Sequence, residues 1–442
     1  MRRKQSKANP IGVSDRENLL NRITNRIRQS LELHEILRTA AVEIRSFLQV
    51  DRVKIYRFAD DESGEVIAEA IDRQRLPSLL GLHFPASDIP QISRDLFIQA
   101  RQRVIVDVRA NRKTLSQLDC TKTGNTLPTE DIRYASVDPC HAEYLTTMGV
   151  CASLVFPILH QKKLWGLLVA HHSQPHRFSE RELQIAQLLV DQVSIAIAQS
   201  DLLAQARHLA HHEATINQIS QLLHTPQPVA EIRQAVLAAT VQALAGSGGR
   251  LYLFAASGDE PAQLYTEGQQ PTLANLEENL SWLRMWRSQL SFGEAEARSH
   301  SQNTSQPLLL QANSLLSTEL FLTSEIQVPS FHSIADLYEV PELQPLLPVF
   351  QATPIRSILM VPLQYHQQTI GNLVIFRNEI ETERLWAGEI QKDDRLLRPR
   401  ASFAVWREVK KGQAQPWTDA QIKLAQAIGI HLYMAVMQRR VE

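Results

Sequence analysis

The chain of 442 residues has few cysteines, almost no net charge and no long hydrophobic run. Three cysteines cannot form a network of disulfides, and their spacing matches no zinc-binding pattern, so we expect a reducing, cytoplasmic compartment. The formal net charge of −1 gives no reason to expect nucleic acid or an anionic membrane as the main partner. No run of about 18 apolar residues is present, and the basic start lacks the apolar segment of a signal peptide.

The common catalytic signatures are missing as well. The sequence contains no P-loop, no GGDEF-like run and no HExxH motif. Its apolar content of 44% and charged content of 21% are ordinary for a globular protein, and its length suits two or three domains. We therefore expect a globular protein that carries no enzyme centre of its own and no metal site.

What the chain does contain is an internal repeat. Ile55 in the first half corresponds to Leu251 in the second, an offset of 196 residues. Gly166 corresponds to Gly371 at an offset of 205, and the block 178–187 recurs at an offset of 239. The last jump in offset means that the second copy carries an insertion of 34 residues.

The insertion falls within residues 377–416. Each copy follows the order helix, strand, strand, helix and loop, strand, strand, helix. The strand signals in the first copy are "RVKIYRF", "GEVIAEAI", "SLVFPIL" and "LWGLLVAHH", and the last two are separated by the hairpin signal "HQKK". The pattern predicts two α/β modules, each with an antiparallel sheet flanked by helices.

A long helix is predicted to connect the two modules. Apolar residues recur at helical spacing over residues 179–224, and Ser179 with Glu182 forms a capping box at the start. A helix of this length usually spans two domains or pairs with another chain. Residues 14–48 also have a helical pattern, capped at Ser14.

Cys140 is the most distinctive of the three cysteines. Asp138 is a good helix N-cap and Pro139 is favoured at the first helical position, so Cys140 falls in the first turn. The free N–H groups and the dipole there lower a thiol pKa and favour the nucleophilic thiolate. His141 points about 100° away around the helix, which argues against a protease-type dyad.

A structural interpretation of each cysteine is also open. The helix start before Cys140 is equally compatible with a small buried cysteine in a capped turn. Cys151 enters a strand, where core packing is the expected role, and Cys120 lies in a polar loop as an incidental thiol.

Three motifs occur together in the first module: "LGLHFPASDIP" (80–90), "CHAEYLTTMGV" (140–150) and "LWGLLVAHH" (164–172). With them the module closely resembles the bilin-binding GAF domain of phytochromes. The insertion "RPRASFAVWREVKKGQAQPW" (398–417) resembles the tongue of the phytochrome-specific PHY domain. The tongue residues implied by the PRxSF and WxE motifs are Pro399, Arg400, Ser402, Phe403, Trp406 and Glu408.

The resemblance implies an α/β (α+β) fold of two tandem GAF-type domains joined by a long helix, with a tongue hairpin in the second. The expected boundaries are a helical extension at 1–34, a GAF domain at 35–200, a connecting helix at 180–228, a PHY-like domain at 229–442 and a tongue at about 377–416. Only a helix precedes the first repeat, so the chain looks like a PAS-less, knotless (group II) phytochrome, similar to the cyanobacterial phytochrome 2 class.

The family attaches its chromophore through cysteine, and the resemblance implies that Cys140 forms the thioether. No cysteine precedes Cys120, so the N-terminal attachment of biliverdin-linked relatives is impossible here. A GAF cysteine implies a bilin with an A-ring ethylidene, and phycocyanobilin is expected. The resemblance implies these chromophore contacts: Tyr56, Phe84, Asp88, Ile89, Arg103, Arg133, His141, Tyr144, Met148, Ser153 and His171.

Some contacts have specific implied roles. The backbone carbonyl of Asp88 accepts pyrrole N–H bonds, His141 stacks near the pyrrole rings, and His171 bonds the D-ring carbonyl. Arg103 and Ser153 hold a propionate. A second family arginine is replaced by Ala135, and Arg133 is the candidate substitute.

Local interpretations also exist for two of these residues. Asp88 precedes Pro90 and can cap the next helix, and a lone histidine on a strand is commonly structural. His172 should face away from the side chain of His171 because strand residues alternate.

The resemblance implies a red/far-red photoreceptor in which light isomerises the C15=C16 bond of the bilin. Arg400 pairs with Asp88 in the dark state, Ser402 is a candidate partner afterwards, and the tongue refolds. The signal leaves through the long helices, which favour a homodimer, to an output domain outside this chain. Three alternatives remain: a tandem-GAF sensor of a cyclic nucleotide or other small ligand, the input half of a sensor histidine kinase, and an interaction scaffold.

Overall fold

The computed structural model describes residues 21, 24–25, 32–99, 102–109, 112–113, 139–255, 261–283, 332–365, 368–388 and 403–441. They form two compact units, each described here by itself. The first extends to Ala206 and includes Glu383–Val409, and the second comprises Arg207–Thr382 and the residues from Lys410 onward.

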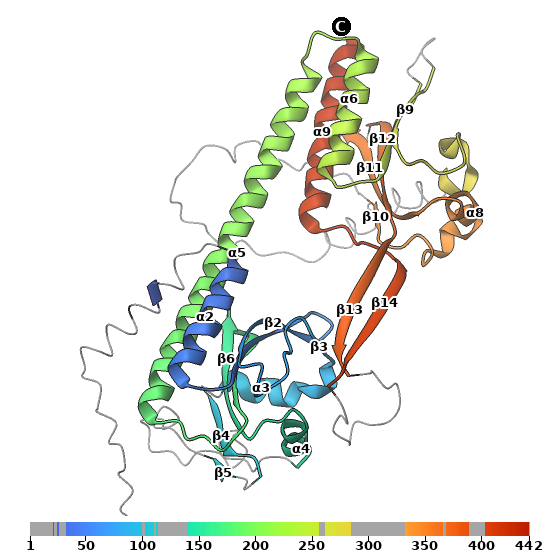
Figure 1. Ribbon diagram of the computed structural model, residues 1–442. Coiled ribbons are helices and arrows are strands. Elements are labelled where there is room, and N and C mark those ends of the chain that lie inside the picture. The colour runs from blue at the N-terminus through green and yellow to red at the C-terminus, as the bar shows by residue number, and fades with distance from the viewer. Residues whose placement is uncertain are drawn as a thin grey trace, which may run out of the picture. The chain divides into compact units, whose positions relative to one another are not determined.

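A mixed sheet organises the first unit (Figure 1). Its strand order is β14-β13-β3-β2-β1-β7-β6-β4-β5, and every recorded pairing is antiparallel except that of Trp386 with His83. The strands are β1 (Arg52–Phe58), β2 (Gly64–Ile71), β3 (His83–Phe84), β4 (Arg103–Asp107), β5 (Arg112–Lys113), β6 (Ala152–His160), β7 (Lys163–His172), β13 (Ile380–Ala387) and β14 (Val405–Gln413). The helices are α2 (Leu33–Leu48), the 3₁₀ turn η1 (Ala86–Asp88), α3 (Gln91–Gln99), α4 (Pro139–Thr147) and the first part of α5 (Glu180–Leu223).

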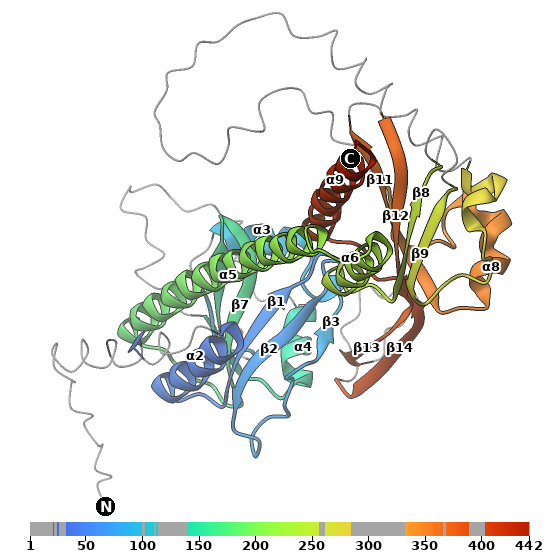
Figure 2. The same ribbon diagram turned by 90° about the horizontal axis from the view of Figure 1, so that it is seen from above.

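Alternate residues of the central strands belong to two different cores. Val53 and Ile55 of β1 pack with Leu168 of β7 against α2 and α5, which cross one face of the sheet (Figure 2). Tyr56 and Leu167 point to the opposite face and join a second apolar cluster. Side chains alternate along a strand, so the residues of β1 that lie between Val53, Ile55 and their neighbours, including Lys54, must face the second cluster.

The predicted β6–β7 hairpin is confirmed. Its two central turn residues, Gln161 and Lys162, have φ values of 50° and 64°. Two successive residues with positive φ are the geometry of a type I′ turn, which matches the twist of a two-strand ribbon.

The predicted long helix is confirmed as α5, which ends at Leu223. The backbone N–H and the hydroxyl of Ser179 each donate to Glu182 Oε2 at 2.7 Å, and the N–H of Glu182 donates to Ser179 Oγ at 3.3 Å. This is the expected capping box. Of the predicted helix 14–48, the described part is α2, and most of residues 14–31 lie outside the described residues.

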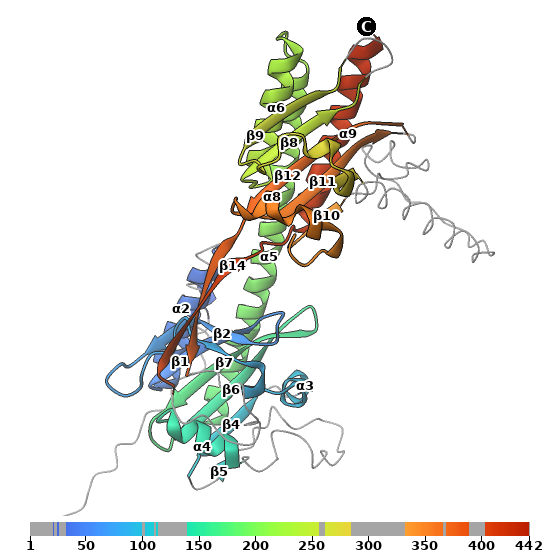
Figure 3. The same cartoon turned by 90° about the vertical axis from the view of Figure 1, so that its right-hand side faces the viewer.

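The second unit repeats the arrangement (Figure 3). Its sheet has the order β10-β11-β12-β8-β9, and β8 pairs with β12 and β9 as β1 pairs with β7 and β2. The helices α6 and α9 lie against this sheet. The elements are α6 (Val229–Ala243), β8 (Gly248–Leu253), β9 (Gln263–Gly268), η3 (Leu276–Glu278), β10 (His332–Ile334), η4 (Pro341–Leu346), α8 (Leu347–Gln351), β11 (Ile355–Tyr365), β12 (Gln368–Asn378) and α9 (Asp419–Val441).

The predicted fold class is confirmed: two related α/β units are connected by α5, and the hairpin strands β13 and β14 follow β12. Within the described ranges, no helix has both the length and the hydropathy needed to cross a bilayer. The described residues also contain no group of three or more His, Cys, Asp or Glu side chains placed to hold a metal ion.

Candidate functional site

The second face of the first sheet forms the floor of a cavity. The floor strands are β1, β7, β6 and β4, and the walls come from η1, α3 and α4. Ten of the predicted contact residues line it: Tyr56, Phe84, Asp88, Ile89, Arg103, His141, Tyr144, Met148, Ser153 and His171. The structure thus brings together residues that are up to 115 positions apart in the sequence, although their chemical roles stay predictions.

The apolar wall depends on close packing around Tyr56. The Tyr56 ring makes edge-to-face contacts with Phe58 and Phe84, with centroids 5.2 and 5.8 Å apart. Opposite the ring lies Gly64, where a Cβ atom would come within 2.1 Å of Tyr56 Cζ. Glycine at this position therefore leaves the space that the Tyr56 ring occupies.

His171 contacts a buried arginine that lies directly opposite it on β1. Arg52 is 0% exposed, and its Nη2 lies 2.9 Å from Nδ1 of His171. Its Nη1 donates to the carbonyl oxygen of Pro77 at 2.8 Å. A guanidinium can only donate, so Nδ1 must accept, and the ring proton is on Nε2.

The electrostatics keep this histidine neutral. Burial lowers the pKa of His171 well below its usual value, and the nearby positive charges of Arg52 and Lys54 lower it further. Burial also lowers the pKa of Arg52 to about 10, so the guanidinium remains charged at neutral pH. A neutral imidazole with a proton on Nε2 can donate one hydrogen bond to an acceptor in the cavity.

His172 faces the other way, as the strand alternation predicts. Its Nδ1 lies 3.1 Å from Asp51 Oδ2, and the same carboxylate oxygen accepts from the backbone N–H of Ser173 at 2.8 Å. Only His171 of the pair belongs to the cavity lining.

Asp88 lies in η1, two positions ahead of Pro90, and turns toward the cavity. The hydroxyl of Tyr144 donates to Asp88 Oδ2 at 3.2 Å. The rings of His141 and Tyr144 are stacked, with centroids 6.2 Å apart and planes 12° from parallel. The hydroxyl of Tyr144 therefore connects the α4 wall to the η1 turn.

Cys140 is the second residue of α4, which begins at Pro139 as expected. This backbone position fits the predicted first-turn thiol, while the Cys140 side chain lies outside the described residues. Arg133, Asp138 and Cys120 also lie outside them. Cys151 is buried before β6, where burial and the nearby Asp107 raise the pKa of its thiol, as suits an unreactive core cysteine.

The loop end of the hairpin formed by β13 and β14 reaches the cavity wall. Phe403 packs edge-to-face against Tyr144, with ring centroids 4.9 Å apart. On β13, Trp386 is 5% exposed and its Nε1 donates to Glu408 Oε2 on β14 at 2.8 Å. Of the predicted tongue residues, Trp406 is half-buried on β14, whereas Pro399, Arg400 and Ser402 lie outside the described residues.

An ion pair also connects the hairpin to the turn between β1 and β2. Arg384 Nη1 lies 2.7 Å from Asp61 Oδ2, and hydrogen bonds from Ser63 and Arg384 lower the pKa of Asp61 to about 2. Both partners are nearly half exposed, so the pair contributes little to stability.

Sequence reasoning missed Arg52 and Lys54. Both are buried, Lys54 lines the cavity, and Arg52 supports His171. A signal was present in "RVKIYRF": charged residues alternate with apolar ones in the same phase as Tyr56, so they had to share its face. Other unpredicted lining residues are Ser93, Phe97, Ile105, Leu145, Val155, Leu167 and Val169.

Two protein-family models match the chain. Residues 32–197 match the GAF domain, and residues 333–441 match the phytochrome region. A bacteriophytochrome of Xanthomonas campestris is 26% identical over 426 residues, which are 93% of this chain and 59% of that protein. The phytochrome-like protein Cph1 of Synechocystis is 28% identical over 429 residues, which are 93% of this chain and 48% of that protein. The chain thus spans about half the length of these relatives.

Solved structures have the same fold. The bacteriophytochrome RpBphP3 of R. palustris has a TM-score of 0.63 at 24% identity, covering 99% of this chain and 77% of that one. The photosensory core module of Stigmatella aurantiaca phytochrome has a TM-score of 0.57 at 22% identity, covering 98% and 76%.

Proposed function

Because the chain belongs to the phytochrome family as a photosensory module with a GAF domain and a phytochrome region, we propose that it is a red/far-red photoreceptor. The proposed ligand is a linear tetrapyrrole, a bilin, in the cavity of the first unit. The observation that carries the proposal is the cavity itself, with apolar walls and a few polar groups at separate positions. Such a lining suits an extended conjugated ligand with polar edges.

Each polar group has a proposed task. Arg103 and Ser153 hold a propionate, and a guanidinium suits a carboxylate because it can donate two parallel hydrogen bonds. His171 donates from Nε2 to the terminal D-ring carbonyl, and the backbone carbonyl of Asp88 accepts from pyrrole N–H groups. Arg133 is the proposed substitute for the missing second arginine.

The proposed attachment is a thioether at Cys140, whose position in the first turn of α4 favours the thiolate. Phycocyanobilin is the proposed chromophore, since a GAF cysteine suits a bilin with an A-ring ethylidene. When bound, the bilin supplies the light absorption and the C15=C16 isomerisation. The protein's own task is to exclude water and to exchange contacts at Tyr56, Asp88 and His171.

The proposed relay starts at the contact of Tyr144 with Phe403. Asp88, Tyr144 and Phe403 form a continuous series from the cavity to the loop end of the hairpin. We assign Arg400 as the dark-state partner of Asp88 and Ser402 as its candidate partner after illumination. The tongue then refolds, Trp406 moves, and α5 and α9 carry the change to an output domain.

A homodimer through α5 is part of the proposal. Four large apolar residues are exposed along this helix at intervals of seven: Leu188 (41%), Ile195 (45%), Leu202 (65%) and Leu209 (60%). A seven-residue period places them on one seam, which a second copy of the same helix would cover.

The alternatives predict different spectra. A tandem-GAF sensor of a cyclic nucleotide or other small ligand, and an interaction scaffold, would remain colourless when supplied with bilin, whereas the input half of a sensor histidine kinase would be identified by an extended reading frame. We therefore propose co-expression with phycocyanobilin biosynthesis, followed by difference spectroscopy under red and far-red light. Reversible exchange of a red for a far-red band is the expected result, and a colourless or photochemically inert protein would overturn the proposal.

A further inference from the structure

Lys54 is a buried cation on the cavity floor. It lies in β1 on the same face as Tyr56, is 6% exposed, and lines the cavity. Among the described residues, no group accepts a hydrogen bond from its Nζ or forms an ion pair with it, and the Nζ lies 5.1 Å from the centroid of the Phe84 ring. Burying an ammonium group without a hydrogen-bond acceptor costs free energy. A ligand in the cavity that brings an acceptor to Lys54 would recover part of that free energy.

The carboxylate of Glu69, opposite Lys54 on β2, already accepts hydrogen bonds from other groups. Glu69 pairs with Lys54 in the β1–β2 register. Its Oε1 accepts from the backbone N–H of Leu79 at 3.0 Å, and its Oε2 accepts from the hydroxyl of Ser78. Glu69 therefore reaches Lys54 only through its longer-range field.

The other charged and titratable groups facing Lys54 come from several elements. They are Arg52 on β1, Glu69 on β2, Asp88 in η1, His171 on β7, His141 and Tyr144 on α4, and Arg103 on β4. Burial, followed by the charge of Arg52, lowers the pKa of Lys54 to about 7, while Glu69 and Asp88 raise it. The amine is thus near its midpoint at neutral pH and responds to any new acceptor.

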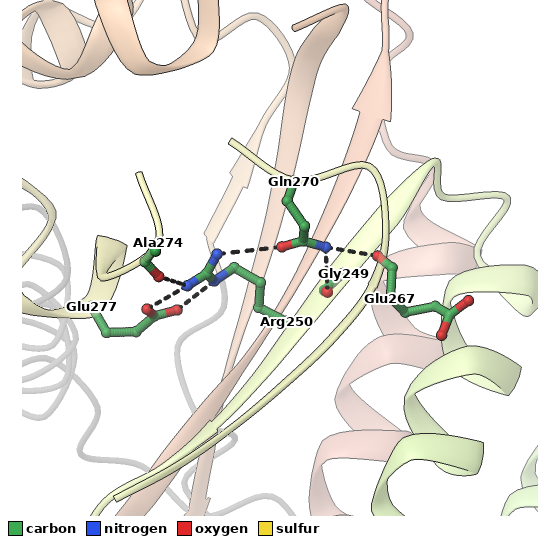
Figure 4. Close-up of polar contacts among 6 residues, drawn as sticks. All are labelled: Gly249, Arg250, Glu267, Gln270, Ala274 and Glu277. Carbon is green, nitrogen blue, oxygen red and sulfur yellow. Dashed lines mark hydrogen bonds and ion pairs between the residues drawn. The ribbon is translucent and has the colours of Figure 1, made fainter. Parts of the chain in front are cut away.

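The internal repeat supplies the comparison. Lys54 pairs with Val169, and the corresponding residues of the second unit, Arg250 and Val374, pair in the same way. Arg250 is neutralised within its own unit: its Nε and Nη2 lie 2.7 and 2.8 Å from the two oxygens of Glu277 (Figure 4). The same side chain also donates to Gln270 Oε1 at 3.3 Å and to the Ala274 carbonyl at 2.6 Å (Figure 4).

The two units thus treat one position differently. In the second unit, Arg250 is surrounded by residues of the same unit that accept its hydrogen bonds. In the first unit, Lys54 faces a cavity instead. An acceptor from a ligand would take the place that Glu277 takes beside Arg250.

We propose that Lys54 is a bilin-binding residue that donates to the terminal-pyrrole carbonyl oxygen, beside His171. Arg103 occupies the same row of the sheet but lies on β4, beyond β7 and β6. Three strand spacings put the backbones of the two residues on the order of 14 Å apart, so we assign Lys54 to the carbonyl beside His171 and not to the carboxylate held by Arg103. The inference rests on the proposed function and names a contact within that site.

Affinity for phycocyanobilin tests the contact directly. The titration uses apoprotein carrying Cys140→Ala, in which no thioether forms. Adding Lys54→Met should weaken binding about tenfold or more, because a hydrogen bond from a charged donor is lost. Lys54→Arg, which installs the residue type of the second unit, should retain most of the affinity.

Lys163→Met is the matched control, because Lys163 is an exposed residue of β7. If Lys54→Met binds as tightly as this control, or if Lys54→Arg loses as much as Lys54→Met, the inference is wrong. Repeating the titration with phycocyanobilin dimethyl ester separates the two oxygen types. A penalty that persists supports the carbonyl contact, and one that disappears with the ester contradicts it.

A second measurement uses the unaltered chain. ¹³Cε-lysine NMR of the apoprotein should reveal one lysine that titrates near pH 7, and pigment loading should raise its pKa because an acceptor favours the charged form. An unmoved titration in a protein that has bound pigment overturns the Lys54 contact alone. A wild-type chain that takes up no pigment overturns the proposed function.

Discussion

Nη2 of Arg52 lies 2.9 Å from Nδ1 of His171, and this contact determines which imidazole nitrogen carries the proton. A guanidinium has no acceptor, so Nε2 of His171 is the protonated nitrogen. The cavity therefore presents an oriented donor before any ligand arrives, and the orientation depends on Arg52, which lies opposite His171 on the neighbouring strand and outside the cavity lining. The same pair supplies the first prediction.

Replacing Arg52 with Gln should allow both neutral tautomers of His171, with the proton on Nε2 or on Nδ1, because glutamine can either donate or accept a hydrogen bond. In ¹⁵N-histidine NMR of the apoprotein, the wild type should have one ring signal typical of a protonated Nε2, and Arg52→Gln should have mixed signals. The variant should also lose about 1–3 kcal/mol of unfolding free energy, because buried polar groups lose partners. Arg57→Gln, at a half-exposed position of β1, is the control. An unchanged His171 spectrum in Arg52→Gln contradicts the positioning role.

The stability of the apoprotein should fall on acidification. The folded pKa of His171 lies well below 6.5 because the ring is buried, whereas the unfolded chain binds its proton near 6.5. The contribution is therefore fully present above the unfolded pKa and is lost as the pH decreases below it, by up to about 1.4 kcal/mol per pH unit. Burial lowers the pKa of His176 as well, so it contributes in the same window.

Urea unfolding at pH 7.5 and 5.5 measures this effect. His171→Gln should reduce the difference between the two pH values, whereas His208→Gln, at an exposed position of α5, should leave it unchanged. A pH difference that His171→Gln does not reduce would rule out His171 as its source.

The predicted secondary structure of the first unit agrees closely with the structure because its strands are short, alternating and bounded by turn residues. The capping box at Ser179 and the turn at Gln161 and Lys162 are local features, so adjacent residues determine them. The residues that form the site are only partly determined by the sequence around them. The family motifs place Asp88 and His171, but the partner of a side chain across strands depends on register.

Register explains what was missed. Arg52 lies opposite His171 because β1 and β7 are antiparallel with this particular alignment, which the sequence pattern does not specify. The alternation of "RVKIYRF" was sufficient to place Arg52 and Lys54 on the face of Tyr56, but not to identify their neighbours. The contact of Phe403 with Tyr144 joins segments 259 residues apart and had no local signal.

Arg400→Ala tests the proposed tongue pairing. The red-absorbing state should survive, because the cavity lining remains intact, while the far-red product should weaken because the exchange of partners at Asp88, which accompanies refolding of the tongue, is disrupted. Difference spectra after red illumination give the ratio of the two bands. Arg407→Ala is the matched control, since Arg407 is exposed on β14 and pairs with Glu383. An unchanged far-red band in Arg400→Ala would remove this residue from the relay.

The seam on α5 predicts a dimer that a single charge disrupts. Leu202→Glu places a carboxylate in the middle of the exposed apolar series and should shift the chain to a monomer in light scattering at micromolar concentration. Ala204→Glu adds the same charge about 200° around the helix and should leave the dimer intact. A wild-type chain that is already monomeric, or a Leu202→Glu dimer, refutes the seam.

Covalent attachment of a bilin at Cys140 is the central claim, and intact mass with zinc fluorescence on a denaturing gel tests it most directly. Co-expressed with phycocyanobilin biosynthesis, the wild type and Cys120→Ala should each gain the mass of one bilin and fluoresce, and Cys140→Ala should do neither. A wild-type chain whose Cys140 thiol stays unmodified in excess pigment would contradict the account.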